Sequence, residues 1–230
     1  MNAGLGSDPA LSDLQVVMRG LFPASMGVGV TDPAAEQPEL MPAEMAATEG
    51  MVPKRLREFS AGRYAARLAM KAIGQSVRPI LMGADRAPIW PEGLRGSIAH
   101  CDSACVAVVT LGDETVGVDI EPDLPLEADL IEVITTVDER ERLQARPISE
   151  RGLLARKLFC AKEAVYKAQY PISKEMFDFH TLNIRFSASM DEFQAIFSRN
   201  VGPFRADQMV RGQFGAAAGF MLAGVILEPV

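Results

Sequence analysis

The chain has 230 residues, of which 48% are hydrophobic, and its formal net charge is −7 at pH 7. This length is large for one simple domain and small for two independent ones, and the apolar fraction is high enough to form a substantial core. Proteins that bind nucleic acids need a strongly basic face, so the acidic balance argues against a nucleic-acid partner.

Signals for export, membrane insertion and disulfide bonding are absent. The N-terminus has no basic segment followed by an apolar run, so we expect no secretory signal. The longest apolar tract, residues 214–227, is too short to span a bilayer and indicates a buried strand or hairpin. Three cysteines argue against a disulfide framework, and no second cluster joins His100 and Cys101 to complete a zinc site. The sequence predicts a cytoplasmic protein with no membrane partner.

The first half of the chain indicates a strand, a connection, a long helix and further strands. Residues 28–33 are apolar and β-branched, and the proline-rich stretch 33–50 indicates an exposed loop. Residues 54–71 carry six cations and one acid, and Arg55, Phe59, Arg63 and Arg67 recur four residues apart along one helical stripe. This stripe suits a substrate with several phosphates, although charge runs are usually solvated helix faces. A strand over 106–111 and a turn over 112–115 follow.

The second half begins with a buried strand over residues 116–121, which ends at the prolines of residues 122–125. Residues 138–157 are rich in Arg and Glu and indicate helices broken at Pro147. Residues 159–167 indicate another helix, so this half has the same order of a strand, a connection and a helix.

Short matches support an internal repeat. Residues 28–33 resemble residues 116–122, and the helix that contains Phe59 aligns without gaps with the helix that contains Phe159. We therefore expect two similar halves, with the alternative of a single α+β domain whose local similarities are coincidental. The two halves are residues 1–113 and residues 114–230.

The alignment of the two helices suggests a division of labour. Arg63 occupies the position of Glu163, and Arg67 occupies that of Lys167. The N-terminal half is therefore expected to hold an anionic substrate, and the C-terminal half a metal ion.

Three carboxylates and one lysine form the predicted metal site. Asp119 and Glu121 lie two residues apart on a strand and share one face, while Glu163 and Lys167 lie four apart on a helix. Mg²⁺ prefers a few carboxylates together with water and phosphate oxygens. The alternative, that these side chains form surface ion pairs or helix caps, explains two acids on an apolar strand poorly. The sequence predicts phosphate chemistry on a metal.

At these residues the chain resembles the 4′-phosphopantetheinyl transferases. Residues 116–121 match the family pattern G-x-D-x-E, and residues 159–167 match [FW]-[SC]-x-K-E-[AS]-x-x-K. Residues 90–100 are similar to the W-P-x-G-x-x-G-S-[IL]-[ST]-H segment of the monomeric surfactin-type and enterobactin-type branch. Residues 54–67 are similar to that branch's K-R-x-x-E-F-x-x-x-R-x-x-A-R helix. The four motifs occur in the family's order across residues 15–185.

The resemblance implies an α+β fold of two pseudo-twofold-related halves with the active site at their interface. It implies Mg²⁺-dependent transfer of the 4′-phosphopantetheine arm of coenzyme A (CoA) to a serine of an apo carrier protein, with release of 3′,5′-ADP. The implied metal ligands are Asp119, Glu121 and Glu163. Asp119, Glu163 and Lys167 are the implied catalytic residues, and either Glu163 or a metal-held water is the base.

The resemblance also implies a set of CoA-binding residues. They are Arg55, Arg63, Ser97, His100, Lys162 and Lys167. Relatives often carry a phosphate-facing lysine where this chain has Met82, and Arg86 is positioned to replace it. His100 has a structural alternative, because a lone histidine is more often part of a core than a ligand.

The expected partners are CoA and apo acyl or peptidyl carrier proteins, which are typically small and acidic. A basic and apolar surface should bind such a partner. Its candidates are Arg140, Arg142, Arg146, Arg151 and Arg156 with Leu143, Leu153 and Leu154. An ordinary amphipathic helix explains these residues equally well. The fused repeat predicts a monomer, and the family serves siderophore, nonribosomal peptide, polyketide and fatty-acid pathways.

Two other functions remain open at this stage. A Mg²⁺-dependent CoA or pyrophosphate hydrolase would use similar chemistry, although the chain has no phosphate-cradling glycine loop of the usual patterns. A non-catalytic module that binds CoA or carrier proteins would be expected to lack Asp119 or Glu163, and the chain has both.

Overall fold

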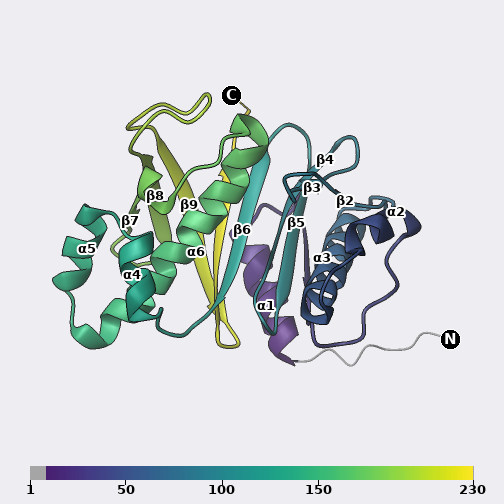
Figure 1. The fold of residues 1–230 in the computed structure, drawn as a ribbon, viewed down its shortest axis with the longest axis horizontal. Coiled ribbons are helices and arrows are strands. Elements are labelled where there is room, and N and C mark those ends of the chain that lie inside the picture. Colours follow the sequence, from purple (N-terminus) through teal and green to yellow (C-terminus); the bar gives the residue numbers. More distant parts are fainter. Residues whose placement is uncertain (1–8, 230) are drawn as a thin grey trace.

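Two antiparallel sheets form the frame of the molecule, and each packs against one long helix (Figure 1). The structure is a computed structural model that describes residues 9–229. The first sheet has the order β1-β5-β4 and the second β6-β10-β9-β8-β7. The strands are β1 (Gly27–Thr31), β4 (Leu94–His100), β5 (Cys105–Leu111), β6 (Thr115–Pro122), β7 (Leu182–Phe186), β8 (Glu192–Phe197), β9 (Met209–Ala217) and β10 (Phe220–Leu227).

The long helices are α3 (Pro53–Ala72), which packs on β1 and β5, and α6 (Ile148–Ser173), which packs on β6 and β10. A third helix, α1 (Pro9–Leu21), contacts β1 and also β9, so it lies across the junction of the two sheets (Figure 1). The fold is therefore α+β, with one sheet-and-helix unit in each half of the chain.

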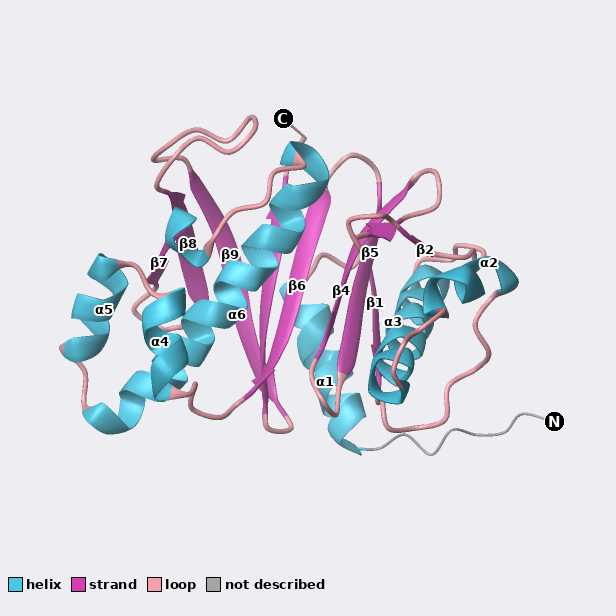
Figure 2. Cartoon of the chain, viewed as in Figure 1, coloured by secondary structure: helices cyan, strands magenta, loops and turns pink. Residues whose placement is uncertain are grey.

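Shorter elements connect this frame, as Figure 2 shows in the helices and strands that flank it. They are α2 (Pro42–Met45), η1 (Ala46–Thr48), β2 (Leu81–Met82), β3 (Pro88–Ile89), α4 (Ala128–Ile134), α5 (Val137–Gln144) and η2 (Phe179–Thr181). β2 and β3 form a small hairpin. Within residues 9–229, no helix is long and apolar enough to cross a membrane.

Several local predictions are confirmed. The apolar tract 214–227 lies in the β9–β10 hairpin, the helices around Pro147 are separate, and β6 ends at Pro122. The predicted loop 33–50 is only partly correct, because it contains α2 and η1 and because the side chain of Glu44 is fully buried. The sequence alone does not distinguish a buried glutamate from exposed ones in a stretch rich in proline and acidic residues.

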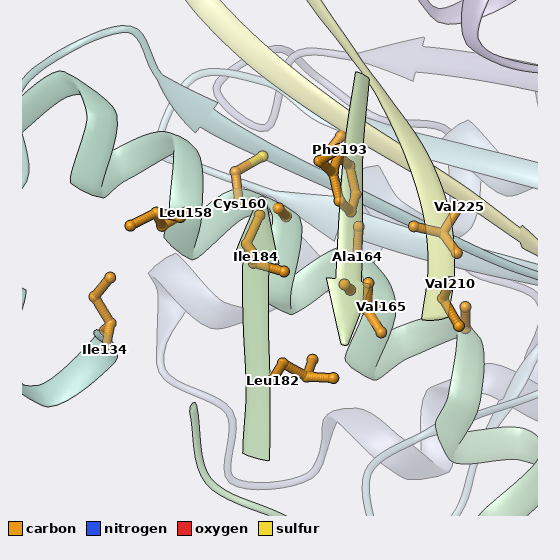
Figure 3. Packing of buried hydrophobic residues seen from close by; sticks show 14 of the residues in the cluster. Ile134, Leu158, Cys160, Ala164, Val165, Leu182, Ile184, Phe193, Val210 and Val225 are labelled. Carbon is orange, nitrogen blue, oxygen red and sulfur yellow. The ribbon is translucent and has the colours of Figure 1, made fainter. Parts of the chain in front are cut away.

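The core of the second half lies between α6 and the five-stranded sheet (Figure 3). Ala164 and Val165 of the helix face Ile184, Phe193 and Val225 of the strands. The small residues of the helix let it lie close to the sheet. This close packing fixes the position of the polar side chains of α6 relative to the strands.

Glycines set the distance between each long helix and its neighbouring strand. A Cβ atom on Gly29 would lie 2.1 Å from the carbonyl oxygen of Ala65, and one on Gly117 would lie 1.9 Å from that of Ala164. No real side chain fits at such distances, so only glycine permits these contacts. The two halves therefore repeat the same close approach of a strand to a helix.

These contacts correct the predicted alignment of the helices by one residue. The buried positions of α3 and α6 coincide when their numbers differ by 99, with Arg67 and Ala155 as the exceptions, whereas the gapless alignment used a difference of 100. Arg63 therefore corresponds to Lys162 and not to Glu163. A sequence match at Phe59 and Phe159 outweighed the burial pattern, which only the fold reveals.

Candidate active site

One face of α6 lies against β6 and carries a stripe of polar side chains. Arg156, Cys160, Glu163 and Lys167 follow at intervals of four, three and four residues, so they share that face. β6 alternates, with Val116, Val118 and Ile120 in an apolar core and the intervening side chains toward α6. Because Gly117 lets the helix approach, the polar side chains of the two elements meet.

Asp119 and Lys167 form the centre of this contact. The Lys167 Nζ lies 2.5 Å from Oδ1 of Asp119, whose side chain is 6% exposed. The other oxygen, Oδ2, is buried and has no hydrogen-bond partner. Burial raises the pKa of Asp119, and the charge of Lys167 opposes that shift. Burial lowers the pKa of Lys167, but Asp119 and Glu163 together raise it above its ordinary value.

Glu121 lies two residues along the strand and pairs with Arg156, which lies 2.8 Å from its Oε2 atom. Burial and the neighbouring charge of Asp119 raise the pKa of Glu121 to about 7, while Arg156 lowers it. Glu163 is half-buried, and its pKa is raised by burial and by Asp119 and lowered by Lys167. Asp119 thus interacts with both glutamates, and Cys160 is fully buried beside it.

These residues fit a Mg²⁺ ion, although they do not form a closed metal cage. In the described part of the chain, no group of three or more His, Cys, Asp and Glu side chains is arranged to hold a metal. Mg²⁺ uses only one or two carboxylates and keeps water or phosphate oxygens as its other ligands. The buried, unpartnered oxygen of Asp119 is the observation that fits such an ion, because an orphaned carboxylate oxygen is costly without a partner.

A basic cluster from the first half lies near this acidic centre. Arg55 lies 2.9 Å from the Nε2 atom of His100, and Glu58 lies 3.7 Å from the same atom. Burial lowers the pKa of His100, and its pKa also responds to the charges of Lys167 and Asp119. The cluster at the end of β4 therefore shares an electrostatic environment with the acids of β6.

Three residues of the predicted CoA-binding set, Lys162, Arg63 and Ser97, are buried in the structure. Lys162 is 1% exposed and donates to Glu139 and to the carbonyl oxygens of Ile134 and Phe179, so its hydrogen bonds are used inside the protein. These contacts favour a structural role for Lys162.

Arg63 and Ser97 are also buried. Arg63 lies over the ring of Phe59 and donates to the carbonyl oxygens of Ile80 and Leu81. Ser97 accepts the backbone N–H of Val118 at 3.1 Å and so joins β4 to β6. The predicted arginine stripe of α3 therefore runs from solvent at Arg55 into the core, and only its exposed end is open to a ligand.

Arg86 lies at the exposed tip of the β2–β3 hairpin, where its φ of 65° is in the left-handed region. Its neighbour Asp85 accepts a hydrogen bond at 2.8 Å from the hydroxyl of Tyr170 on α6. The hairpin thus extends from the first half to the helix that carries Glu163. This position keeps Arg86 available for an anion, whereas Met82 carries no charge.

Two features of the site were missed in the sequence. Arg156 was assigned to a docking surface, although its place seven residues before Glu163, on the same helical face, was a signal that it belongs to the site. A cavity of about 110 Å³ beside Glu163 is lined by Tyr166, Phe177 and Phe179. These aromatic residues come from α6 and the loop that follows it, and no local motif marked them.

The fold and the site define an enzyme with two repeated halves, an acidic centre in one and a basic cluster in the other. Residues 43–110 match the 4′-phosphopantetheinyl transferase N-terminal domain, and residues 115–205 match the 4′-phosphopantetheinyl transferase superfamily. The chain belongs to this family and is a 4′-phosphopantetheinyl transferase.

Relatives of known name agree with this assignment. The chain is 36% identical to 4′-phosphopantetheinyl transferase Npt of Nocardia iowensis over 75% of its own length and 76% of the relative's. It is 31% identical to 4′-phosphopantetheinyl transferase PptT of Mycobacterium tuberculosis (strain ATCC 25618 / H37Rv) over 86% and 89% of the two chains. It is 42% identical to enterobactin synthase component D of Salmonella typhi over 50% and 48%.

Proposed function

We propose that this enzyme transfers the 4′-phosphopantetheine arm of CoA to a serine of an apo carrier protein, releases 3′,5′-ADP and depends on Mg²⁺. The observation that carries the proposal is the Asp119 carboxylate, which holds Lys167 with one oxygen and leaves the other buried without a partner. Placed beside Glu121 and Glu163, that oxygen is suited to a hard cation that also binds phosphate.

Asp119 and Glu121 would hold the metal, with water and phosphate oxygens as its other ligands, and Glu163 would lie beside it as a further carboxylate. Bound there, Mg²⁺ would neutralise charge on the pyrophosphate of CoA and hold it in line for attack. Lys167 contacts Asp119 through its ammonium group, and its side chain is only partly buried, so we assign to it a contact with a substrate phosphate as well. Its role is to stabilise the negative charge that develops on the leaving ADP oxygen.

The chemical step is a displacement at phosphorus. The serine Oγ forms a bond to the pantetheine-side phosphorus, and the bond from that phosphorus to the bridging oxygen breaks. The bridging oxygen leaves with the electron pair as part of 3′,5′-ADP. The serine proton goes either to the Glu163 carboxylate or to a water held beside it. The reaction needs positioning and charge stabilisation more than covalent help.

Arg55 and His100 are the proposed partners of the 3′-phosphate end of CoA, with Arg86 as a further contact from the hairpin. Arg55 is exposed and donates to Nε2 of His100, so its guanidinium still has further N–H groups for a phosphate. Residues 1–113 would then bind the nucleotide end of CoA, and residues 114–230 the metal. The two separate family matches, which meet between residues 110 and 115, support this division.

A carrier protein would bind near the start of α6. The side chains of Ile148 and Leu153 are exposed there, next to the exposed Arg146. Leu143 is buried, and Arg140, Arg142, Arg151 and Arg156 donate to groups of their own chain, so these are weaker candidates than the sequence suggested. We propose the exposed apolar side chain of Ile148, with Arg146, as the docking surface for an acidic partner.

The test is incubation of the enzyme with CoA, MgCl₂ and several apo carrier proteins, read by intact-mass spectrometry. A gain of one phosphopantetheine on the carrier, lost in Glu163→Gln, is the expected result. Carriers from siderophore assembly come first, since enterobactin synthase component D is a relative. Free phosphopantetheine without carrier modification would indicate a hydrolase, and no chemistry would indicate a binding module. Because both halves of the site come from one chain, we expect a monomer, which light scattering would test.

A further inference from the structure

We propose that Arg156 is a positioning residue that orients Glu121 for metal binding, and this inference rests on the proposed Mg²⁺-dependent function. Its guanidinium lies 2.8 Å from Oε2 of Glu121, and both side chains are largely buried, at 13% and 15% exposure. A charge-assisted hydrogen bond in such a place restricts the carboxylate more strongly than an exposed ion pair does.

Arg156 is itself fixed by the chain around it. Its guanidinium also donates to the carbonyl oxygens of Leu124 at 3.3 Å and Pro125 at 3.4 Å, and it pairs with Glu127 at 3.5 Å. Leu124 and Pro125 follow directly after the end of β6. The guanidinium therefore links α6, the end of the metal-bearing strand and the Glu121 side chain in one network, so the carboxylate is held relative to both elements.

A similar pairing of an acid on β6 with a cation on α6 occurs two residues earlier on the strand, at Asp119. Lys167 holds Oδ1 of Asp119 and leaves Oδ2 without a partner, and Arg156 holds Oε2 of Glu121 by a single hydrogen bond. Lys167 and Arg156 lie eleven residues apart, which is close to three helical turns, so both project from the same face of α6. Each cation of the helix thus holds one oxygen of an acid on β6.

Residues that orient metal ligands commonly change metal affinity by about 10- to 100-fold when they are removed. We therefore expect Arg156→Met to raise the Mg²⁺ concentration for half-maximal activity at least tenfold, with most of kcat recovered at saturating Mg²⁺. The KM for the carrier protein should stay within twofold, which a docking role would not allow. Arg156→Lys keeps the charge but not the several hydrogen bonds of the guanidinium. Its Mg²⁺ concentration for half-maximal activity should therefore lie between those of the wild type and Arg156→Met.

The matched control is Arg151→Met on the same helix. Arg151 donates to the carbonyl oxygens of Arg146 and Gln144, away from Glu121, so its removal should leave the Mg²⁺ requirement unchanged. A second control is Glu121→Gln, in which Arg156→Met should add no further loss of metal affinity, because the two changes act through one contact.

Metal affinity is also measured without turnover, from the electron paramagnetic resonance signal of free Mn²⁺ titrated with each variant. Weaker Mn²⁺ binding by Arg156→Met at unchanged melting temperature supports the proposal. Unchanged Mn²⁺ binding by Arg156→Met, or equal losses in Arg151→Met, would overturn it. If the wild type binds Mn²⁺ but modifies no carrier, the proposed function fails while the role of Arg156 is still decided. Should Arg156→Met not fold, Arg156→Lys and the Glu121→Gln background give the same decision.

Discussion

Glu139 repeats in the second half the contacts that Glu44 makes in the first. Each accepts the backbone N–H at the start of its own short helix and the N–H of a residue in an extended segment, and each pairs with a cation of a long helix. The partners of Glu44 are Met41, Ile80 and Arg67, and those of Glu139 are Thr136, Ile184 and Lys162. Both glutamates are buried, so each connects a short helix, an extended segment and a long helix in the interior of its half.

This relationship predicts that Lys162 stabilises the fold and does not bind substrate. Removal of one partner from a buried pair leaves the other charge uncompensated, which costs about 3 to 5 kcal/mol. We expect Lys162→Met to lower the free energy of unfolding by about that amount in urea titrations. Lys167→Met is the comparison, with a large loss of activity and a smaller loss of stability. Normal stability of Lys162→Met with weakened CoA binding would contradict the assignment.

The Arg55–His100 cluster predicts how the enzyme distinguishes CoA from 3′-dephospho-CoA. Loss of a hydrogen bond to a charged group costs about 1.5 to 3 kcal/mol, which corresponds to roughly a tenfold or larger rise in KM. We expect Arg55→Met and His100→Ala to raise the KM for CoA by that factor and to leave the KM for 3′-dephospho-CoA nearly unchanged. Arg95→Met, whose arginine pairs with Asp113, is the control. An equal rise in KM for both substrates would show that the cluster contacts a part of CoA other than the 3′-phosphate.

The lowered pKa of His100 predicts a pH dependence of stability. Burial is its main cause, Glu58 opposes it and Arg55 adds to it. Because the folded pKa lies below about 6.5, the unfolded chain takes up the proton first, and the wild type loses stability as the pH falls below that value. Relative to His100→Gln, the wild type should therefore be less stable at pH 5.5 than at pH 7.5 in urea titrations. A difference independent of pH would show that His100 is not desolvated.

The exposed apolar side chain at the start of α6 predicts a selective defect in carrier binding. Ile148 is 81% exposed, so Ile148→Asp should change stability little while it repels an acidic partner. We expect a higher KM for the carrier protein and an unchanged KM for CoA in steady-state kinetics. Val16→Asp on α1, where the side chain is 67% exposed, serves as the control and should change neither constant. An unchanged carrier KM in Ile148→Asp would argue against this docking surface.

The sequence predicted several of the main elements because their patterns are strong and local, but it did not predict α1, β7 or β8. The apolar strand at residues 116–121 and the cationic helix after Pro53 were recognisable from alternation and spacing alone. The pairing of Asp119 with Lys167 was not predicted, since it depends on how α6 lies against β6. The approach of those two elements is set by Gly117, whose role becomes visible only in the fold.

Charged residues were harder to assign than apolar ones. Lys162 and Arg63 match family positions, yet both are buried against groups of their own half, and Arg156 belongs beside Glu121. A motif identifies a residue type at a position but not the direction of its side chain. Neighbours distant in sequence, such as Glu139 for Lys162, decide whether the charge faces a ligand or the core.

The two halves carry different polar side chains on their long helices, and this gives the proposed site a direction. In the aligned helices, Glu163 and Lys167 correspond to Tyr64 and Leu68, so the first half has no counterpart of the polar pair. A symmetric frame would accept a dinucleotide-like molecule in either of two opposite orientations. With acids at one end and cations at the other, only one orientation is favourable, and each polypeptide should titrate with a single equivalent of ligand.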